Sequence, residues 1–266
     1  MSEASGARVP TVVVDSMQVY REIPTITNQH RRRPAELVGV ASVTEEWTVA
    51  RHRERAVEEI SKSGISVEIS AVLDAGTGMY LNAILLDSPL APKVDPRLRE
   101  LARAFSAEAP NPRRAARAKE LELAGAAERG SVWDGELRYE VVGFYLRPER
   151  HLLDARIEAR SREMVREGLR DAASVQAMID AGARVNSSVL DSIGLRELLG
   201  HLRGETTPQE ASALVAARTR RLARRQIRWF DKLLRTLEGR IALKVVANPS
   251  DANVGDLLKC SMHDTI

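Results

Sequence analysis

The chain has 266 residues, of which 44% are hydrophobic, and this is enough for one large domain or for a core that carries a small embedded domain. Its net charge is only +3, and its single cysteine, Cys260, excludes an intramolecular disulfide and fits a reducing compartment. The histidines lack metal-ligand spacing, so we expect no structural zinc site. No apolar run approaches the roughly 20 residues of a membrane span, and the N-terminus lacks the apolar core of a signal peptide, so we expect a soluble cytoplasmic protein.

The first third of the chain alternates between strand and helix patterns. Residues Thr11–Val14 are apolar and β-branched without alternation, which is typical of a short strand buried on both faces. Further strands are expected at 36–43 and 65–73, and helical spacing predicts helices over 48–64 and 79–86. This order of strands and helices favours a parallel sheet covered by helices.

The rest of the chain is mainly helical. Residues 87–96 contain three prolines and indicate a linker or the boundary of an insertion. After them we expect, in chain order, helices over 97–110 and 111–130, a strand over 138–146, and helices over 148–168 and 207–237.

Two polar segments follow predicted strands, where parallel sheets bind ligands. Asp15 begins the first segment, and its carboxylate could act as a general base. The second segment, 75–78, leads into a helix, so its backbone N–H groups could face an anion, and the Thr77 hydroxyl could face a phosphate or Mg²⁺. Each signal also has a plain structural interpretation, because an Asp after a strand is more often a cap and Gly-Thr-Gly is more often only a turn.

Six arginines lie between Arg218 and Arg228 in the last predicted helix. Four of them form one stripe at helical spacing: Arg218, Arg221, Arg225 and Arg228. The stripe is either the solvated face of an amphipathic helix or a phosphate-binding surface for nucleic acid or diphosphate. Spacing alone does not decide between the two.

Six segments, taken together and in this order, resemble the tRNA dimethylallyltransferase (isopentenyltransferase) family. They are DSMQVYR, AGTGMYLNAIL, NPRRAARAKELE, RHLLDARIEARSREMVREGL, SIGLREL and TRRLARRQIRWF, and they cover most of residues 15–230. The resemblance implies an α/β fold, with a P-loop-NTPase-like parallel sheet flanked by helices and a helix-rich C-terminal half. It also implies a catalytic core (1–90 and 136–247), a shortened helical tRNA-binding insertion (91–135) and a tail (248–266).

The family transfers a dimethylallyl group from its diphosphate to N6 of an adenosine next to the tRNA anticodon, usually with Mg²⁺. The resemblance therefore implies two partners, dimethylallyl diphosphate and the tRNA anticodon stem-loop. Carried over by position, the implied roles are general base for Asp15, the catalytic channel for Thr77, the flipped adenine for Ser16, Met17 and Gln18, tRNA contact for Arg113, Arg114 and Arg117, and diphosphate or RNA contact for Arg220, Arg224 and Gln226.

The chain departs from the family at its N-terminus. Only fourteen residues precede Asp15 and no Gly-Lys pair occurs, so we expect the first strand, the P-loop and the first helix to be absent. Asp74 and residues 23–29 also differ from the family pattern. The alternatives are a misassigned start or truncation, a diverged member that binds RNA without transferase activity, and a donor site supplied by another chain. An exposed sheet edge would then lower stability or be covered in an oligomer.

Overall fold

The computed structural model describes residues 9–62, 70–92, 94–106, 108–110, 112–126 and 131–253. Its contacts divide the chain into two compact units. Unit 1 comprises Met1–Ile84 and Tyr139–Ile266, and unit 2 comprises Leu85–Arg138. No helix in the described ranges is both long enough and apolar enough to cross a membrane.

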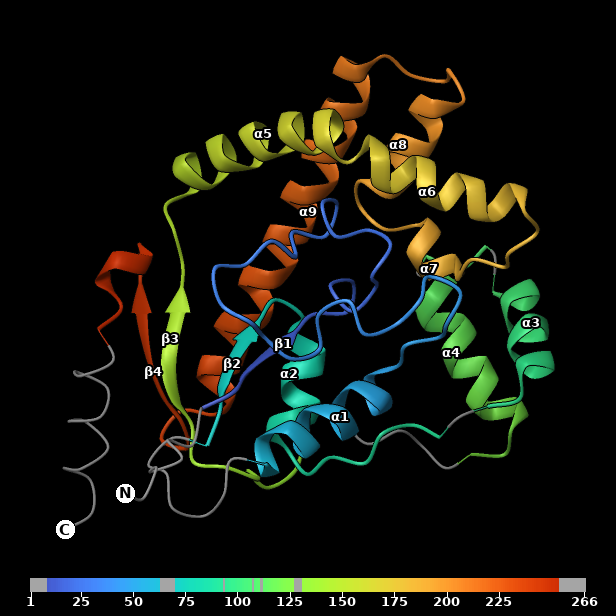
Figure 1. Ribbon diagram of the computed structural model, residues 1–266. Coiled ribbons are helices and arrows are strands. Elements are labelled where there is room, and N and C mark those ends of the chain that lie inside the picture. Colours follow the sequence, from blue (N-terminus) through green and yellow to red (C-terminus); the bar gives the residue numbers. More distant parts are fainter. Residues whose placement is uncertain are drawn as a thin grey trace, which may run out of the picture. The chain divides into compact units, whose positions relative to one another are not determined.

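Unit 1 contains two pairs of parallel strands (Figure 1). Strand β1 (Thr11–Val14) pairs with β2 (Val72–Ala75), and β3 (Val142–Leu146) pairs with β4 (Ala242–Val246). The predicted parallel pairing is therefore present, but the described strands form two small sheets instead of one. β1 is the buried strand that its apolar β-branched sequence indicates, since Val12, Val13 and Val14 are all at most 1% exposed.

The strand predicted over 36–43 is wrong. Glu36 makes a single bridge to β1, through Glu36 N–H to the Thr11 oxygen and Val13 N–H to the Glu36 oxygen. Leu37 and Gly39 then have φ angles of 63° and 61°, which turn the chain out of the extended conformation. The segment next follows the loop after β1, where Gly39 N–H donates to the Gln18 oxygen.

The other predicted strands of unit 1 are shifted. Much of 65–73 falls outside the described residues, and β2 continues past the predicted end, through Asp74 to Ala75. The strand predicted over 138–146 begins only at Val142. β4 was not predicted.

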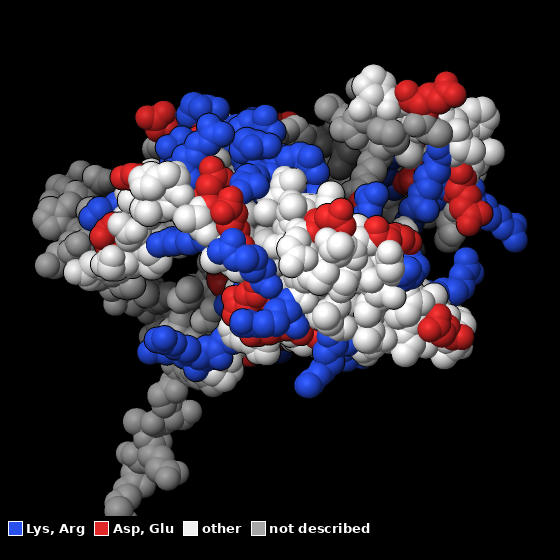
Figure 2. Space-filling view, turned by 90° about the horizontal axis from the view of Figure 1, so that it is seen from above, with Lys and Arg blue, Asp and Glu red and all other residues white. Residues whose placement is uncertain are grey.

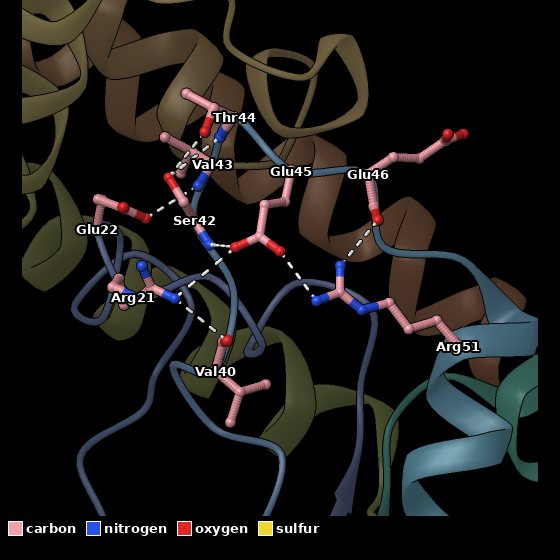
Figure 3. Close-up of polar contacts among 9 residues, drawn as sticks. All are labelled: Arg21, Glu22, Val40, Ser42, Val43, Thr44, Glu45, Glu46 and Arg51. Carbon is pink, nitrogen blue, oxygen red and sulfur yellow. Dashed lines mark hydrogen bonds and ion pairs between the residues drawn. The ribbon is translucent and has the colours of Figure 1, made fainter. Parts of the chain in front are cut away.

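The loop between β1 and the first helix is held by polar contacts around Glu45 (Figure 3). The Glu45 carboxylate accepts hydrogen bonds from Ser42 N–H, at 2.8 Å, and from the Arg51 guanidinium, at 2.9 Å. The Ser42 bond is the main cause that lowers the pKa of Glu45. Glu22 accepts from Val43 N–H at 3.0 Å, so both halves of this loop are tied together.

Seven helices complete the described part of unit 1: α1 (Val49–Ser61), α2 (Gly78–Leu85), α5 (Arg150–Glu167), α6 (Leu169–Asp180), α7 (Ser187–Leu190), α8 (Leu195–Leu202) and α9 (Pro208–Thr236), followed by the 3₁₀ turn Pro249–Asp251. α2 crosses into unit 2 by its last residue. The helices predicted over 48–64, 79–86, 148–168 and 207–237 correspond to α1, α2, α5 and α9. α6, α7 and α8 were not predicted.

The long helix α9 begins at a capping box. Thr207 Oγ1 accepts from Glu210 N–H at 3.2 Å, and the Glu210 carboxylate accepts from Thr207 N–H at 2.8 Å. Pro208 at the first helical position has no N–H to satisfy there. α9 packs along α5 and contacts α8, which places its apolar residues, among them Val215 and Leu233, in the core.

Unit 2 is built on two packed helices, α3 (Pro96–Phe105) and α4 (Pro112–Leu123). They fall within the predicted helices 97–110 and 111–130, apart from the start of α3. Asp95 caps α3 by accepting from Arg97 N–H at 2.8 Å. Asp87 N–H donates to the Glu136 oxygen at 2.8 Å, so the two ends of unit 2 lie side by side.

Candidate functional site

Asp15 stands at the carboxyl end of β1 and organises the turn that follows it. Its Oδ1 accepts hydrogen bonds from Met17 N–H, at 2.8 Å, and from Gln18 N–H, at 3.1 Å. Its Oδ2 lies near Gly76, where an added methyl carbon would stand 2.9 Å from it, and accepts no hydrogen bond from the described residues. The side chain is thus both a turn cap and a carboxylate with one oxygen left for a ligand.

Burial raises the pKa of Asp15 above its ordinary value of 3.8. The two backbone hydrogen bonds act in the opposite direction but do not cancel this effect, and the neighbouring charge of Asp74 raises the pKa further. A carboxylate with a raised pKa is a better proton acceptor than an ordinary one. The local chemistry therefore suits a general base.

Thr77 lies two residues after the end of β2, next to Ser16 in the segment that follows β1. Its hydroxyl oxygen accepts a hydrogen bond from Ser16 N–H at 3.2 Å, which joins the two strand-end segments. The expectation that the N–H groups of this turn face an anion is wrong for two of them. Gly76 N–H and Thr77 N–H both donate to the Val14 oxygen, at 3.1 and 3.0 Å, because they continue the pairing of β1 with β2.

Helix α9 closes the other side of this turn. Gln226 Nε2 donates to the Gly76 oxygen at 2.8 Å, and Trp229 Nε1 donates to Asn82 Oδ1 on α2 at 3.1 Å. The Trp229 ring lies against Gly78, and a methyl group there would overlap it. A side chain larger than hydrogen is therefore excluded at Gly78 unless Trp229 moves.

A third connection joins the same two strand ends. Arg31 Nη2 donates to Gln18 Oε1 at 2.8 Å, and Arg31 Nη1 pairs with Asp74 Oδ2 at 2.7 Å. Arg31 was not among the predicted site residues, and Asp74 was noted only as a departure from the family. The sequence holds no local signal for this pair, because Arg31 lies in an irregular loop 43 residues before Asp74.

The predicted residues at the strand ends thus lie together with Gln226, whereas Arg220 does not join them. Arg220 pairs with Glu158 at 2.5 Å and with Asp154 at 3.5 Å, both on α5. It precedes Gln226 by six residues, or about 9 Å along the helix axis. The pairing satisfies its charge within the α5–α9 contact.

The predicted arginine stripe is also broken at Arg218. This residue pairs with the buried Glu197 at 2.6 Å and donates to the Asp191 oxygen at 2.6 Å, so its charge is used inside the fold. Four exposed arginines in the middle of α9, Arg221, Arg224, Arg225 and Arg228, make no ion pair with any described residue. Their spacing places them within about 100° of the helix circumference.

We call these four residues the arginine face. Figure 2 shows Lys and Arg side chains gathered along one edge of the molecule as viewed there. Unpaired guanidinium groups on one side of a helix attract phosphates. Of the two α9 arginines predicted by resemblance to contact diphosphate or RNA, Arg224 belongs to this face and Arg220 does not.

The three arginines predicted to contact tRNA lie on α4 in unit 2. The side chains of Arg113 and Arg114 lie outside the described residues. Arg117 pairs with Glu120 at 2.6 Å and donates to the Pro92 oxygen at 2.8 Å, so it stabilises unit 2. Its predicted contact with tRNA would compete with these two bonds.

Unit 1 is an α/β structure whose parallel strands carry a carboxylate and a hydroxyl at their carboxyl ends, the class in which ligands bind beyond the strand ends. The family model described as IPP transferase matches residues 18–233. A tRNA dimethylallyltransferase from Rubrobacter xylanophilus is 61% identical over all 266 residues of this chain, which span 90% of that protein. The chain therefore belongs to the IPP transferase family.

More distant relatives agree with this assignment. The tRNA dimethylallyltransferase 1 of Citrifermentans bemidjiense is 31% identical over 262 residues, which cover 87% of this chain and 83% of that protein. The crystal structure of the tRNA isopentenylpyrophosphate transferase of Bacillus halodurans has a TM-score of 0.63 at 24% identity, covering 90% of this chain and 82% of that one. A eukaryotic dimethylallyltransferase acting on tRNA has a TM-score of 0.69 at 20% identity, covering 93% and 70%. These two structures support the fold.

Proposed function

We propose that the protein transfers a dimethylallyl group from dimethylallyl diphosphate to N6 of an adenosine next to a tRNA anticodon, with Asp15 as the general base. The observation that carries this is the position of Asp15 Oδ2, which accepts no described hydrogen bond while Oδ1 is held by Met17 and Gln18. The 61% identical relative from Rubrobacter xylanophilus, named a tRNA dimethylallyltransferase, supports the same reaction.

In the proposed reaction, the N6 amine attacks C1 of the dimethylallyl group. The N6–C1 bond forms, the bond from C1 to the diphosphate oxygen breaks, and the diphosphate leaves with the electron pair. Asp15 Oδ2 takes the proton that N6 loses. Burial of Asp15, which raises its pKa, favours this transfer. The adenine has to leave its stack to reach the strand ends, as bases do in other base-modifying enzymes.

The residues around Asp15 would orient the reactants. Thr77 already accepts from Ser16 N–H, and its own hydroxyl proton remains a donor toward the leaving diphosphate. Gln226 fixes the Gly76 carbonyl. Ser16, Met17 and Gln18 lie in the turn that would hold the adenine. A contact between Arg220 and the diphosphate requires its pairs with Glu158 and Asp154 to open.

The described residues do not build a protein-held Mg²⁺ site. No group of three carboxylate, histidine or cysteine side chains comes together in the described ranges. Proteins usually bind Mg²⁺ through one or two carboxylates together with substrate phosphates. Magnesium thus remains a prediction linked to the donor diphosphate, and we assign no step of the reaction to it.

Binding of the tRNA is proposed for two surfaces. The arginine face of α9 supplies to the RNA backbone four charges that no described residue pairs with. Unit 2, whose two helices fall in the segment assigned to the tRNA-binding insertion, would supply the second surface. The P-loop-NTPase-like sheet and an oligomer that covers its edge also remain proposals. Both concern the sheet around Thr11–Val14, whose described partners are β2 and the bridge at Glu36.

A second candidate function is RNA binding without transfer. It is favoured by the departures from the family pattern at Asp74 and at residues 23–29. The arginine face would serve either function.

One experiment separates these functions. The protein is incubated with dimethylallyl diphosphate and an anticodon stem-loop that contains the target adenosine, and the mass of the RNA is measured. We expect the mass gain of one dimethylallyl group, and we expect Asp15→Asn to abolish it while the thermal melt and the RNA affinity stay unchanged. Stem-loop binding by the unmodified protein without any mass gain would favour the second candidate.

A further inference from the structure

The Gln18 side chain is held in one orientation by Arg31. Because a guanidinium group only donates hydrogen bonds, the amide oxygen of Gln18 must face Arg31, at 2.8 Å from Nη2. The backbone of Gln18 is held on both sides, since its N–H donates to Asp15 and its oxygen accepts from Gly39 N–H. The amide nitrogen of Gln18 makes no hydrogen bond with a described residue, and it belongs to the turn whose backbone Asp15 caps.

Asp74 in turn holds Arg31. The two nitrogens of one planar guanidinium reach Gln18 Oε1 and Asp74 Oδ2, at 2.8 and 2.7 Å, so the carboxylate sets the direction of the fork. Asp74 is 54% exposed, and an ion pair with so exposed a partner contributes little to folding stability. Because its contribution to stability is small, the role that its contacts suggest for Asp74 is to orient the Arg31 guanidinium.

We propose that Arg31 and Asp74 are positioning residues that make Gln18 present its amide nitrogen to a ring-nitrogen acceptor of the substrate base. This inference rests on the proposed function and adds a determinant of base recognition to it. Adenine carries ring-nitrogen acceptors beside its N6 amine, so a donor from Gln18 and a base from Asp15 would address neighbouring parts of the same ring. A lysine at position 31 keeps the charge but cannot bridge both acceptors with one rigid fork.

The test measures base-dependent binding and transfer together. Two stem-loops are compared, one with adenosine and one with an abasic nucleotide at the target position. The affinity for each is measured with the unmodified protein and with three variants, Arg31→Lys, Asp74→Asn and Gln18→Ala. We expect the unmodified protein to prefer the adenosine stem-loop and Arg31→Lys to lose about tenfold of that preference, the loss expected for one hydrogen bond. Affinity for the abasic stem-loop should stay the same in all variants.

Two further measurements make the result specific. Arg32→Lys is the matched control, because Arg32 is the exposed neighbour of Arg31 and makes no described side-chain hydrogen bond or ion pair; it should leave the preference unchanged. The double variant Arg31→Lys with Gln18→Ala should be no weaker than Gln18→Ala alone, because both changes remove the same contact. In the transfer assay the loss should fall mainly on KM for the RNA.

The inference is overturned if the unmodified protein binds both stem-loops equally, if Arg31→Lys keeps the full preference, or if the two changes add independently. Lack of transfer by an unmodified protein that still prefers adenosine through Arg31 would contradict the proposed function alone. Melting curves of each variant show whether a lost preference comes from unfolding. If Arg31→Lys is unfolded, the preference of Asp74→Asn for the adenosine stem-loop tests the inference in its place.

Discussion

The Gln226 side chain on α9 donates a 2.8 Å hydrogen bond to the backbone oxygen of Gly76, 150 residues earlier in the chain. This bond attaches the long C-terminal helix to the strand-end turn that contains Thr77. It also explains why α9 approaches the Asp15 site with its Gln226 side while its arginine face stays exposed.

Gln226→Ala should lower the rate of transfer more than it lowers stability. Loss of one partly buried hydrogen bond costs about 1 kcal/mol of folding free energy, whereas displacement of the Gly76–Thr77 turn affects the reacting groups directly. The measurement is kcat/KM for the stem-loop together with the urea midpoint. Gln209→Ala, at an exposed position of α9 outside the arginine face, is the control for the loss of a glutamine from this helix.

Gly78→Ala should destabilise the protein by about 1–3 kcal/mol, because the added methyl group overlaps the Trp229 ring and overpacking costs this much. Urea unfolding measures the effect. Gly143→Ala is the matched control, since a methyl group there would meet only the flexible end of Leu243 at 3.1 Å. Equal midpoints for the two variants would show that Trp229 can move aside without loss.

The acid limb of the transfer rate should follow Asp15, whose pKa is raised above 3.8. Activity is lost as pH falls through this pKa, because the protonated carboxyl cannot accept the N6 proton. The described charges that face Asp15 are Asp74, which raises its pKa, and Arg31, which lowers it. Asp74→Asn should therefore shift the acid limb to lower pH, and Arg31→Gln should shift it to higher pH. A limb that moves the same way in both variants would contradict this assignment.

Stability should fall in acid because of His52. Its side chain is completely buried and its Nδ1 accepts from Trp47 Nε1 at 3.0 Å, and burial lowers its pKa from 6.5 to about 4. The folded pKa lies below the unfolded one, so the contribution is complete above pH 6.5 and is lost as pH falls toward 4. Its full size is about 3 kcal/mol. Chemical denaturation at several pH values measures the slope, which His52→Gln should flatten.

Two arginines of α9 that look alike in the sequence should behave differently. Arg218→Ala leaves Glu197 buried and without its ion-pair partner, which costs about 3–5 kcal/mol. Arg221→Ala should change stability by less than about 0.5 kcal/mol but reduce the salt dependence of RNA binding by about one unit of slope. Thermal melts and binding at several salt concentrations test both, and an unchanged salt slope in Arg221→Ala would remove this residue from the RNA surface.

The sequence by itself determined the local elements and the family. The β-branched run at Thr11–Val14 predicts β1, and the apolar periodicity of 148–168 and 207–237 predicts α5 and α9, because burial of one face and helix capping are local properties of the chain. It could not show that 36–43 leaves the extended conformation, since Leu37 adopts a positive φ that its residue type does not favour.

Only the tertiary structure decided which polar groups meet. Asp15 and Thr77 follow separate strands, and the parallel register of β1 with β2 brings their ends together. The same packing uses Arg218, Arg220 and Arg117 in ion pairs, although the sequence indicated a surface role for each. It also joins Arg31 to Gln18 and Asp74. These contacts depend on distances between segments far apart in the chain, and residue spacing carries no information about such distances.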